Sequence, residues 1–258
     1  KKLKIKINLK FMKNYLNLFV TLFVAAAAST IFISCEVEHG KDGIDGINGL
    51  DGINGVDGKD ASVFLAASKS PNLLKVTGDF VNLKITPILT SEDVIPNTPD
   101  FVYGSMADGA GLINNGNDTY TLINNIEADY SIARILLNKN LRPFHGEYIL
   151  NATATAETAQ CSGTLISPEE HGFGPLYLSG GEWGGASKGV FVLDPSKSTN
   201  DASSGELLSA LGQWSTENAV PIGKDAYADK TVVFIGDDHA DNSVPSGQLG
   251  MYVGNRGD

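Results

Sequence analysis

The chain has 258 residues and a formal net charge of −11, which comes from 30 acidic and 19 basic residues. This balance excludes nucleic acid as a partner, because phosphate backbones are bound through clustered Lys and Arg side chains.

Residues 1–34 have the pattern of a bacterial lipoprotein signal peptide behind a short upstream extension. Met12 and a lysine precede an apolar stretch from Tyr15 to Ile33, and a serine then precedes Cys35. This order predicts cleavage before Cys35 and acylation of its thiol. The alternative is a transmembrane anchor, because about 20 apolar residues can span a bilayer. We expect a lipid-anchored protein of the bacterial cell envelope, on the outer membrane or facing the periplasm or the cell surface.

Residues 35–61 contain a collagen-like Gly-x-y tract, in which glycine recurs at every third position from Gly40 to Gly58. The tract has no proline, and each y position is Asp or Asn. A chain without proline is not preorganised for the collagen triple helix, so we expect a flexible acidic tether. The alternative is a tract that assembles the protein into a trimer. Without residues 1–34 the net charge falls to about −17, which suits a calcium-rich exterior.

Residues 62–258 form the globular part, which is long enough for one sizeable core. Short runs of β-branched and aromatic residues between turn residues predict an all-β domain, either a sandwich or a propeller. Asn114 to Asp118 has the composition of a hairpin turn, and only Gly205–Leu211 has the periodicity of a helical turn or two. The expected strands are Phe80–Thr86, Thr119–Asn125, Ile132–Asn138, Gly189–Leu193, Thr231–Ile235 and Gln248–Val253.

Cys161 is the only cysteine besides Cys35. If Cys35 carries a lipid, Cys161 is either a free thiol or a metal ligand. A free cysteine is commonly a small buried hydrophobe, which is the alternative to a ligand. Acidic residues that follow strand-like runs accompany this thiol, and together they favour a metal site. These residues are Glu169, Glu170, Glu217, Asp237 and Asp238.

The order of several short motifs resembles the PhoX-type alkaline phosphatases, over roughly Ala107 to Gly254. Asn124-Asn125-Ile126-Glu127 precedes Ser131-Ile132-Ala133-Arg134, and Cys161-Ser162-Gly163-Thr164 precedes Glu169 and Glu170. Thr216-Glu217-Asn218-Ala219 and then Gly236-Asp237-Asp238 follow in the same order.

The resemblance implies a β-propeller enzyme that hydrolyses phosphate monoesters at a site containing iron and calcium. It implies that Cys161 and Glu217 are catalytic residues and iron ligands. It also implies that Glu169, Glu170, Asp237 and Asp238 are ligands of iron or calcium.

This sequence departs from the family pattern at several positions. The usual Trp-Gly between the cysteine and the glutamates is replaced by Leu165 to Pro168. Asn125 and Thr216 stand where the family tends to have histidine. Family members continue for several more blades, so the resemblance implies an incomplete, C-terminally truncated β-propeller-like domain that is nearly inactive by itself.

Other residues have simpler interpretations. His171 and His239 each follow two acids, and such a histidine is more often a solvated hydrogen-bonding residue than a ligand. Trp183 is expected to anchor a glycine-rich loop.

The main hypothesis is therefore a metal-dependent phosphate monoester hydrolase, and two alternatives remain. One is a non-catalytic, calcium-stabilised propeller that binds or displays a partner. The other is a collagen-like structural lipoprotein whose globular part caps a trimer.

Overall fold

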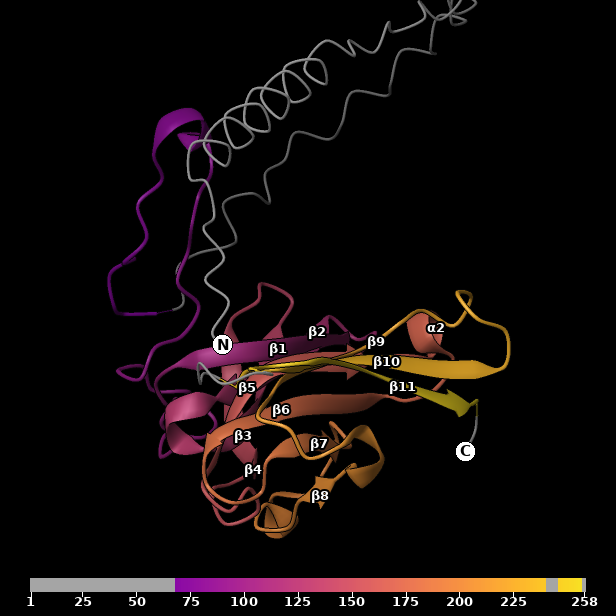
Figure 1. Ribbon diagram of the computed structural model, residues 1–258. Helices are drawn as coiled ribbons and strands as arrows, with labels where there is room; N and C mark the ends of the chain where they lie inside the picture. The colour runs from indigo at the N-terminus through magenta and orange to yellow at the C-terminus, as the bar shows by residue number, and fades with distance from the viewer. Residues whose placement is uncertain (1–67, 240–245, 257–258) are drawn as a thin grey trace, which may run out of the picture. The chain divides into compact units, whose positions relative to one another are not determined.

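The structure is a computed structural model that describes residues 68–239 and 246–256. The predicted signal peptide, the acylated Cys35 and the Gly-x-y tether lie outside these residues. The described part of the chain folds mainly into β-strands, which form three antiparallel sheets. The all-β prediction is therefore confirmed at this level, and none of the three sheets closes on itself (Figure 1).

Each sheet is a meander in which strands that are consecutive in sequence pair with one another. The first sheet has the order β1-β2-β3-β4, the second has the order β5-β6-β7-β8, and the third contains β9, β10 and β11. The strand bounds are β1 Ala107–Asn114, β2 Thr119–Ile126, β3 Ser131–Asn138, β4 Pro143–Leu150, β5 Thr158–Ile166, β6 Leu176–Gly184, β7 Gly189–Leu193, β8 Glu206–Leu207, β9 Thr216–Pro221, β10 Lys230–Asp237 and β11 Leu249–Asn255.

The described helices are all short. They are η2 Gly78–Phe80, η3 Glu127–Asp129, α2 Pro168–His171, η4 Thr199–Asp201 and η5 Ser209–Leu211. Within the described residues, no helix combines the length and apolarity that a membrane span requires.

Turn residues fix the register of the first hairpin. Gly116 and Asp118 adopt positive φ angles of 74° and 60°, which glycine and short polar residues tolerate best. The amide of Asn115 donates to the carbonyl of Thr119 at 3.1 Å and closes the hairpin. The predicted turn between residues 114 and 118 is therefore confirmed.

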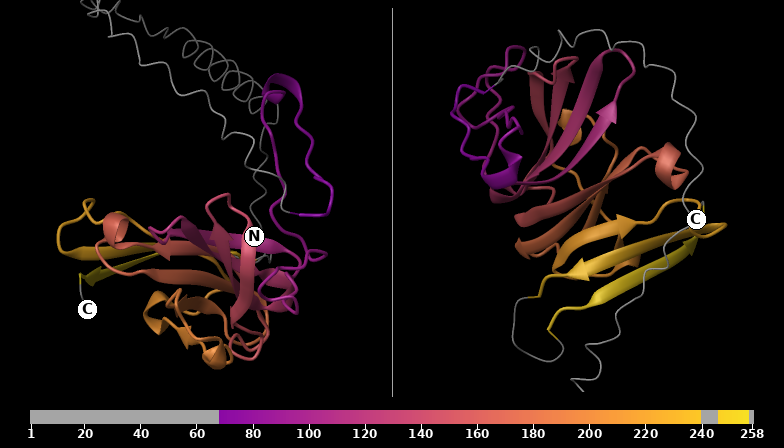
Figure 2. Two further views of the ribbon diagram at one scale, coloured as in Figure 1. Left: turned by 180° about the vertical axis from the view of Figure 1, so that it is seen from behind. Right: turned by 90° about the horizontal axis from the view of Figure 1, so that it is seen from above.

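Apolar side chains pack the three sheets against one another in series. The right-hand view of Figure 2 shows the three sheets in this order. One cluster joins the first and second sheets, and another joins the second and third. The first strands of the sheets lie next to one another, because β1 contacts β5 and β5 contacts β9. The first cluster contains Ile123, Ile132, Ile149, Leu150, Tyr177, Phe191 and Leu193. The second contains Ile166, Leu178, Val190, Leu211, Ala219, Val233 and Ile235.

The approach of β1 to β5 depends on two glycines. A Cβ atom at Gly109 would overlap the amide nitrogen of Gly163 and would lie 2.5 Å from the carbonyl carbon of Ser162. Only a residue without a side chain permits two backbones to approach this closely. The hydroxyl of Tyr177 donates to the carbonyl of Gly109 at 2.9 Å and fixes β1 at this point.

Most of the predicted strands correspond to strands of the structure. The strands predicted near residues 119–125, 132–138, 189–193, 231–235 and 248–253 are β2, β3, β7, β10 and β11. The strand predicted at Phe80–Thr86 is wrong, because this segment pairs with no strand of the described chain. The predicted helical segment Gly205–Leu211 instead contains the short strand β8 and the single 3-10 turn η5.

Candidate metal centre

Cys161 lies in β5, where the first strands of the three sheets come together. Its side chain is buried, and its thiol donates a hydrogen bond to Oε2 of Glu182 at 2.7 Å. It is a free cysteine. When a buried thiol is hydrogen-bonded to a carboxylate, a cation can displace the thiol proton.

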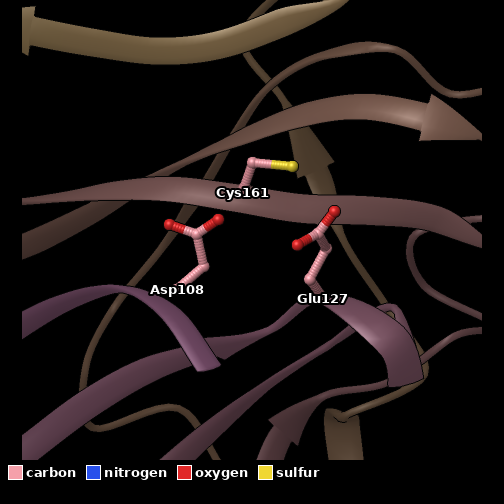
Figure 3. A group of neighbouring side chains, drawn as sticks. All are labelled: Asp108, Glu127 and Cys161. Carbon is pink, nitrogen blue, oxygen red and sulfur yellow. The ribbon is translucent and has the colours of Figure 1, made fainter. Parts of the chain in front are cut away.

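Two groups of acidic side chains share the Cys161 sulfur. In one group, Sγ and one carboxylate oxygen each of Glu182 and Glu217 lie within 4.8 Å of one another. In the other, Sγ and one oxygen each of Asp108 and Glu127 satisfy the same limit. Figure 3 shows the carboxylates of Asp108 and Glu127 rising from the first sheet toward the strand that carries Cys161. The sulfur is therefore a member of two potential cation positions.

All three sheets supply side chains to these groups. Asp108 lies on β1, and Glu127 is the first residue of η3, directly after β2. Glu182 lies on β6 beside Cys161, and Glu217 lies on β9 of the third sheet. Asp238 follows β10, and its carboxyl group contacts that of Glu182. Acidic residues that are distant in sequence lie together here because the first and second strands of the three sheets converge at this point.

Hydrogen bonds orient two of these carboxylates. The Ser162 hydroxyl donates to Oε1 of Glu217 at 2.7 Å. The indole nitrogen of Trp183 donates to Oε1 of Glu127 at 2.6 Å, and the Trp183 ring packs edge-on against Tyr130 at a centroid distance of 6.1 Å. Such outer partners fix the direction of a potential ligand atom.

A buried polar network holds the backbone beneath the thiol. The Asn125 amide donates to the carbonyl of Cys161 and to the hydroxyl of Ser179. Its Oδ1 accepts from the hydroxyl of Tyr177 at 3.1 Å. The Ser179 hydroxyl in turn donates to Oε1 of Gln160 at 2.8 Å. A satisfied network of this kind fixes a single backbone position for β5.

The site is electrostatically strained in the absence of a cation. Burial raises the pKa of the Cys161 thiol, and its bond to Glu182 and the charges of Glu182, Glu127 and Glu217 raise it further. Burial likewise raises the pKa of Glu182 from 4.5 to about 7, and the neighbouring Asp238 and Glu217 add to this rise. The pKa of Asp108 is also raised, by burial and by the charge of Glu127. A bound cation would offset this repulsion.

The raised pKa of Glu182 predicts that the metal-free protein loses stability as pH rises from about 4.5 to about 7. Between these values the folded protein binds more protons than the unfolded chain, so the free energy of unfolding falls with increasing pH. Urea midpoints measured in chelator at pH 5 and pH 8 test this expectation. Glu182→Gln should flatten the difference, and the exposed Glu169→Gln should not. Equal pH dependence in wild type and Glu182→Gln would contradict the assignment.

The residues predicted from the sequence divide between the site and its surroundings. Cys161 and Glu217 lie together, and Asp238 contacts Glu182. Asp237 is the last residue of β10, and its amide donates to the carbonyl of Gln248. Glu169 and Glu170 are exposed on α2 and belong to neither group of side chains around the sulfur.

His171 also has a structural role in this fold. It is buried at the end of α2, and its Nδ1 accepts from the amide of Ser167 at 3.1 Å. This bond supports the short helix and directs the ring nitrogen toward the backbone.

Three acidic residues of the site were not predicted from the sequence. Glu127 appeared in a family-like motif without an assigned role. Glu182 lies among glycines, and Asp108 lies between small residues, so neither follows an apolar run. On β6 five consecutive buried residues precede Glu182, so no alternation along this strand could have marked it.

Comparisons of this chain with protein-family models, with curated proteins and with solved structures found no match.

Proposed function

We propose that the side chains around Cys161 bind two metal cations and that the protein is a metal-dependent phosphate monoester hydrolase of the PhoX-like type. The observation that carries this proposal is the sharing of one buried sulfur by two acidic groups. A thiolate in this position could contribute to both cation positions, and the sequence resemblance implies that Cys161 is an iron ligand.

The donor atoms fit the expected metals. Carboxylate oxygens are the preferred ligands of calcium, and Glu127, Glu217 and Asp108 supply them from different elements of the fold. The sulfur of Cys161 favours a softer metal such as iron, because calcium is a poor match for a thiolate ligand. We propose iron at the Cys161 sulfur and calcium at the carboxylates of Asp108, Glu127 and Glu217.

We further propose that the three sheets are successive blades of a β-propeller. Three features support this: each sheet is an antiparallel meander, consecutive sheets pack face to face, and their first strands are neighbours. In a propeller the first strands line the central channel, where residues from different blades converge. The position of Cys161, Glu217 and Asp108 on first strands agrees with this arrangement.

The protein's own residues would position the groups that take part in catalysis. Bound cations supply the charge that neutralises a phosphate ester and activates an oxygen nucleophile. Ser162 and Trp183 hold Glu217 and Glu127 in fixed orientations. Asn125 fixes the backbone of Cys161, and Glu182 accepts a hydrogen bond from the Cys161 thiol. Half-exposed Trp183 stands at the edge of the cluster, where an organic group of the ester could contact it.

Calcium is expected to stabilise the protein through this cluster. A ligand that binds only the folded state adds RT ln(1 + [L]/Kd), so calcium at about 100 times Kd should add roughly 2.7 kcal/mol. Thermal melts with calcium and with chelator measure this gain. Glu217→Gln should remove most of it, whereas the double substitution Glu169→Gln, Glu170→Gln on α2 should leave it intact. Loss of the gain in the α2 variant alone would instead favour the ligands that the sequence resemblance implies.

Hydrolysis of a chromogenic phosphate monoester, measured alongside iron content, tests the catalytic proposal. The 258-residue chain is expected to bind metal with little activity, and the longer protein implied by the family resemblance is expected to be active. The second candidate is the calcium-stabilised binding propeller, which the exposed aromatic face of Trp183 favours. A longer protein that binds calcium, contains no iron and hydrolyses no ester would support this second candidate.

A further inference from the structure

The first sheet borders a cavity that is separate from the residues around Cys161. The cavity has a volume of about 340 Å³ and lies between the chain that precedes β1 and the turn that joins β3 to β4. No member of the two acidic groups around the sulfur lines it, and no residue of the third sheet does. Small-molecule sites occupy roughly 300–1,000 Å³, so this cavity has room for a small ligand.

Hydrogen bonds and packing hold the two walls of the cavity together. The amide of Asn97 donates to the carbonyl of Phe144 on β4 at 3.1 Å, and the amide of Gly146 donates to the hydroxyl of Thr98 at 2.9 Å. Ile95 lines the cavity and is 2% exposed, and a Cβ atom at Gly146 would lie 2.8 Å from its Cδ1. The cavity is therefore a fixed part of the fold around the first sheet.

Arg142 lines this cavity, and its guanidinium group bonds to no described residue. Its Nε is enclosed by protein and has no hydrogen-bond partner in the described part of the chain. The terminal nitrogens also lack a partner there but are not enclosed, so they are the part of the group that is open to the cavity. The ion pairs among the described residues join Arg134 and His145 to Glu147. The charge of Arg142 is therefore available to an oxoanion, whose two oxygens match the arginine fork.

The turn holds Arg142 in place through its backbone. The amide of Arg142 donates to Oδ1 of Asn138 at 3.1 Å, and the amide of Asn138 donates to the carbonyl of Arg142 at 3.0 Å. The amide of Asn140 donates to the same Oδ1 at 2.9 Å. None of these bonds uses the arginine side chain, so a substitution at this position leaves them intact.

Two other charged residues, Lys69 and Asp93, line the cavity. Oδ1 of Asp93 accepts from the amide of Lys69 at 2.7 Å, and its Oδ2 accepts from the amide of Thr90 at 2.8 Å. Backbone amides thus bind both oxygens of this carboxylate. Two cationic side chains and one carboxylate leave the wall with a single net positive charge. This charge matches a monocarboxylate better than it matches the more highly charged phosphate group.

Much of the remaining wall is apolar. Leu89, Val94 and Phe144 contribute hydrocarbon groups to it. An inorganic anion would gain nothing from these side chains, whereas an apolar group attached to the carboxylate would be removed from water by them. The cavity therefore combines one cationic fork with an apolar wall.

We propose that this cavity binds a small monocarboxylate with an apolar body, which is either a free acid or the C-terminus of an apolar peptide. The terminal nitrogens of Arg142 donate to the two carboxylate oxygens, Lys69 adds positive charge at the opening, and the apolar body lies against Leu89, Val94 and Phe144. This inference is independent of the metal centre.

Nuclear magnetic resonance of the full chain carrying Cys35→Ser, which removes the expected acylation site, tests the proposal. Hexanoate is the probe for a free acid, and N-acetyl-leucine is the probe for a peptide C-terminus. The chain has three arginines, Arg134, Arg142 and Arg256. We expect millimolar probe to shift the Nε proton signal of Arg142 alone, because the other two already donate to protein oxygens. Whichever probe binds more tightly identifies the source of the carboxylate.

Two matched variants and a neutral analogue measure the contribution of the arginine, with the amide signal of Phe144 as the readout. Arg142→Gln should weaken hexanoate binding by about tenfold or more. Lys139→Gln removes the same charge from an exposed position in the same turn that does not line the cavity, and should change the affinity by less than about twofold. Hexanamide has the shape of hexanoate without its charge, and should bind at least about tenfold more weakly.

Four outcomes would overturn the proposal. Equal weakening by Lys139→Gln and Arg142→Gln would show diffuse attraction of anions, and equal affinities for hexanoate and hexanamide would show that the carboxylate is not recognised. Inorganic phosphate that binds more tightly than hexanoate would indicate a phosphate site instead. Absence of a shift with both probes would exclude a carboxylate site. If Arg142→Gln does not fold, the comparison of hexanoate with hexanamide on the unsubstituted cavity still decides the question.

Discussion

Cys161→Ser is expected to lower iron binding by about two orders of magnitude or more and, in the longer protein, to abolish the phosphatase activity that we propose. A thiolate is a strong ligand for iron, whereas a serine hydroxyl ionises poorly and is a weak ligand at neutral pH. Loss of a residue that only orients a metal ligand typically costs about 10- to 100-fold in metal affinity, so loss of the ligand itself should cost more. Elemental analysis and hydrolysis of a chromogenic ester measure the two effects.

A matched substitution separates ligand loss from damage to the strand. Ala159 lies two residues before Cys161 on β5 and is also buried. Ala159→Ser introduces a buried hydroxyl in the same strand without altering a ligand, so it should lower stability and preserve iron binding. Iron content that is unchanged in Cys161→Ser would exclude the sulfur as a ligand and would favour the binding propeller.

Gly109→Ala is expected to destabilise the domain by at least about 3 kcal/mol. The added methyl group would overlap the backbone of β5 at Ser162 and Gly163, and backbone atoms cannot rotate away as a flexible side chain can. Overpacking in a tight core typically costs about 1–3 kcal/mol, and separation of two strands should reach or exceed the upper end. Urea midpoints at a fixed pH in chelator measure the change without a contribution from metal.

The control for this substitution is a glycine with free space around it. A Cβ atom at Gly223 would meet only the carbonyl oxygen of Glu170, at 3.7 Å. Gly223→Ala should therefore change stability by no more than about 0.5 kcal/mol. Similar losses for both variants would show that the close approach of β1 and β5 contributes little to stability.

The strands that the sequence predicted have apolar side chains in continuous or alternating runs. β3 and β10 are examples, because their branched residues are buried between sheets. β5 and β6 were missed because buried polar residues and glycines interrupt them. Gln160 and Ser179 are buried only because each finds a partner on the neighbouring strand, and that partner is invisible in a single segment. Phe80–Thr86 shows the converse, since an alternating pattern does not form a strand without an edge to pair with.

The site was predicted in part for a similar reason. Cys161 was prominent because a lone thiol behind a predicted lipoprotein signal peptide needs an explanation, and Glu217 followed from its place in the motif order. Glu169 and Glu170 are consecutive acids next to a proline, and that proline starts a short exposed helix instead of directing them inward. The side chains that do surround the sulfur come from three sheets, and only the packing of those sheets brings them together.

The distribution of the acidic groups over three sheets has a consequence for how the domain unfolds. Asp108 belongs to the first sheet, Glu182 to the second and Glu217 to the third. Without a cation, mutual repulsion of these groups favours separation of the sheets, whereas a cation bound at the centre that we propose would tie all three together. Metal loading would therefore decide whether the sheets open as independent cooperative units or as one. A loaded centre would then make unfolding of the three sheets a single cooperative transition, whatever reaction the centre supports.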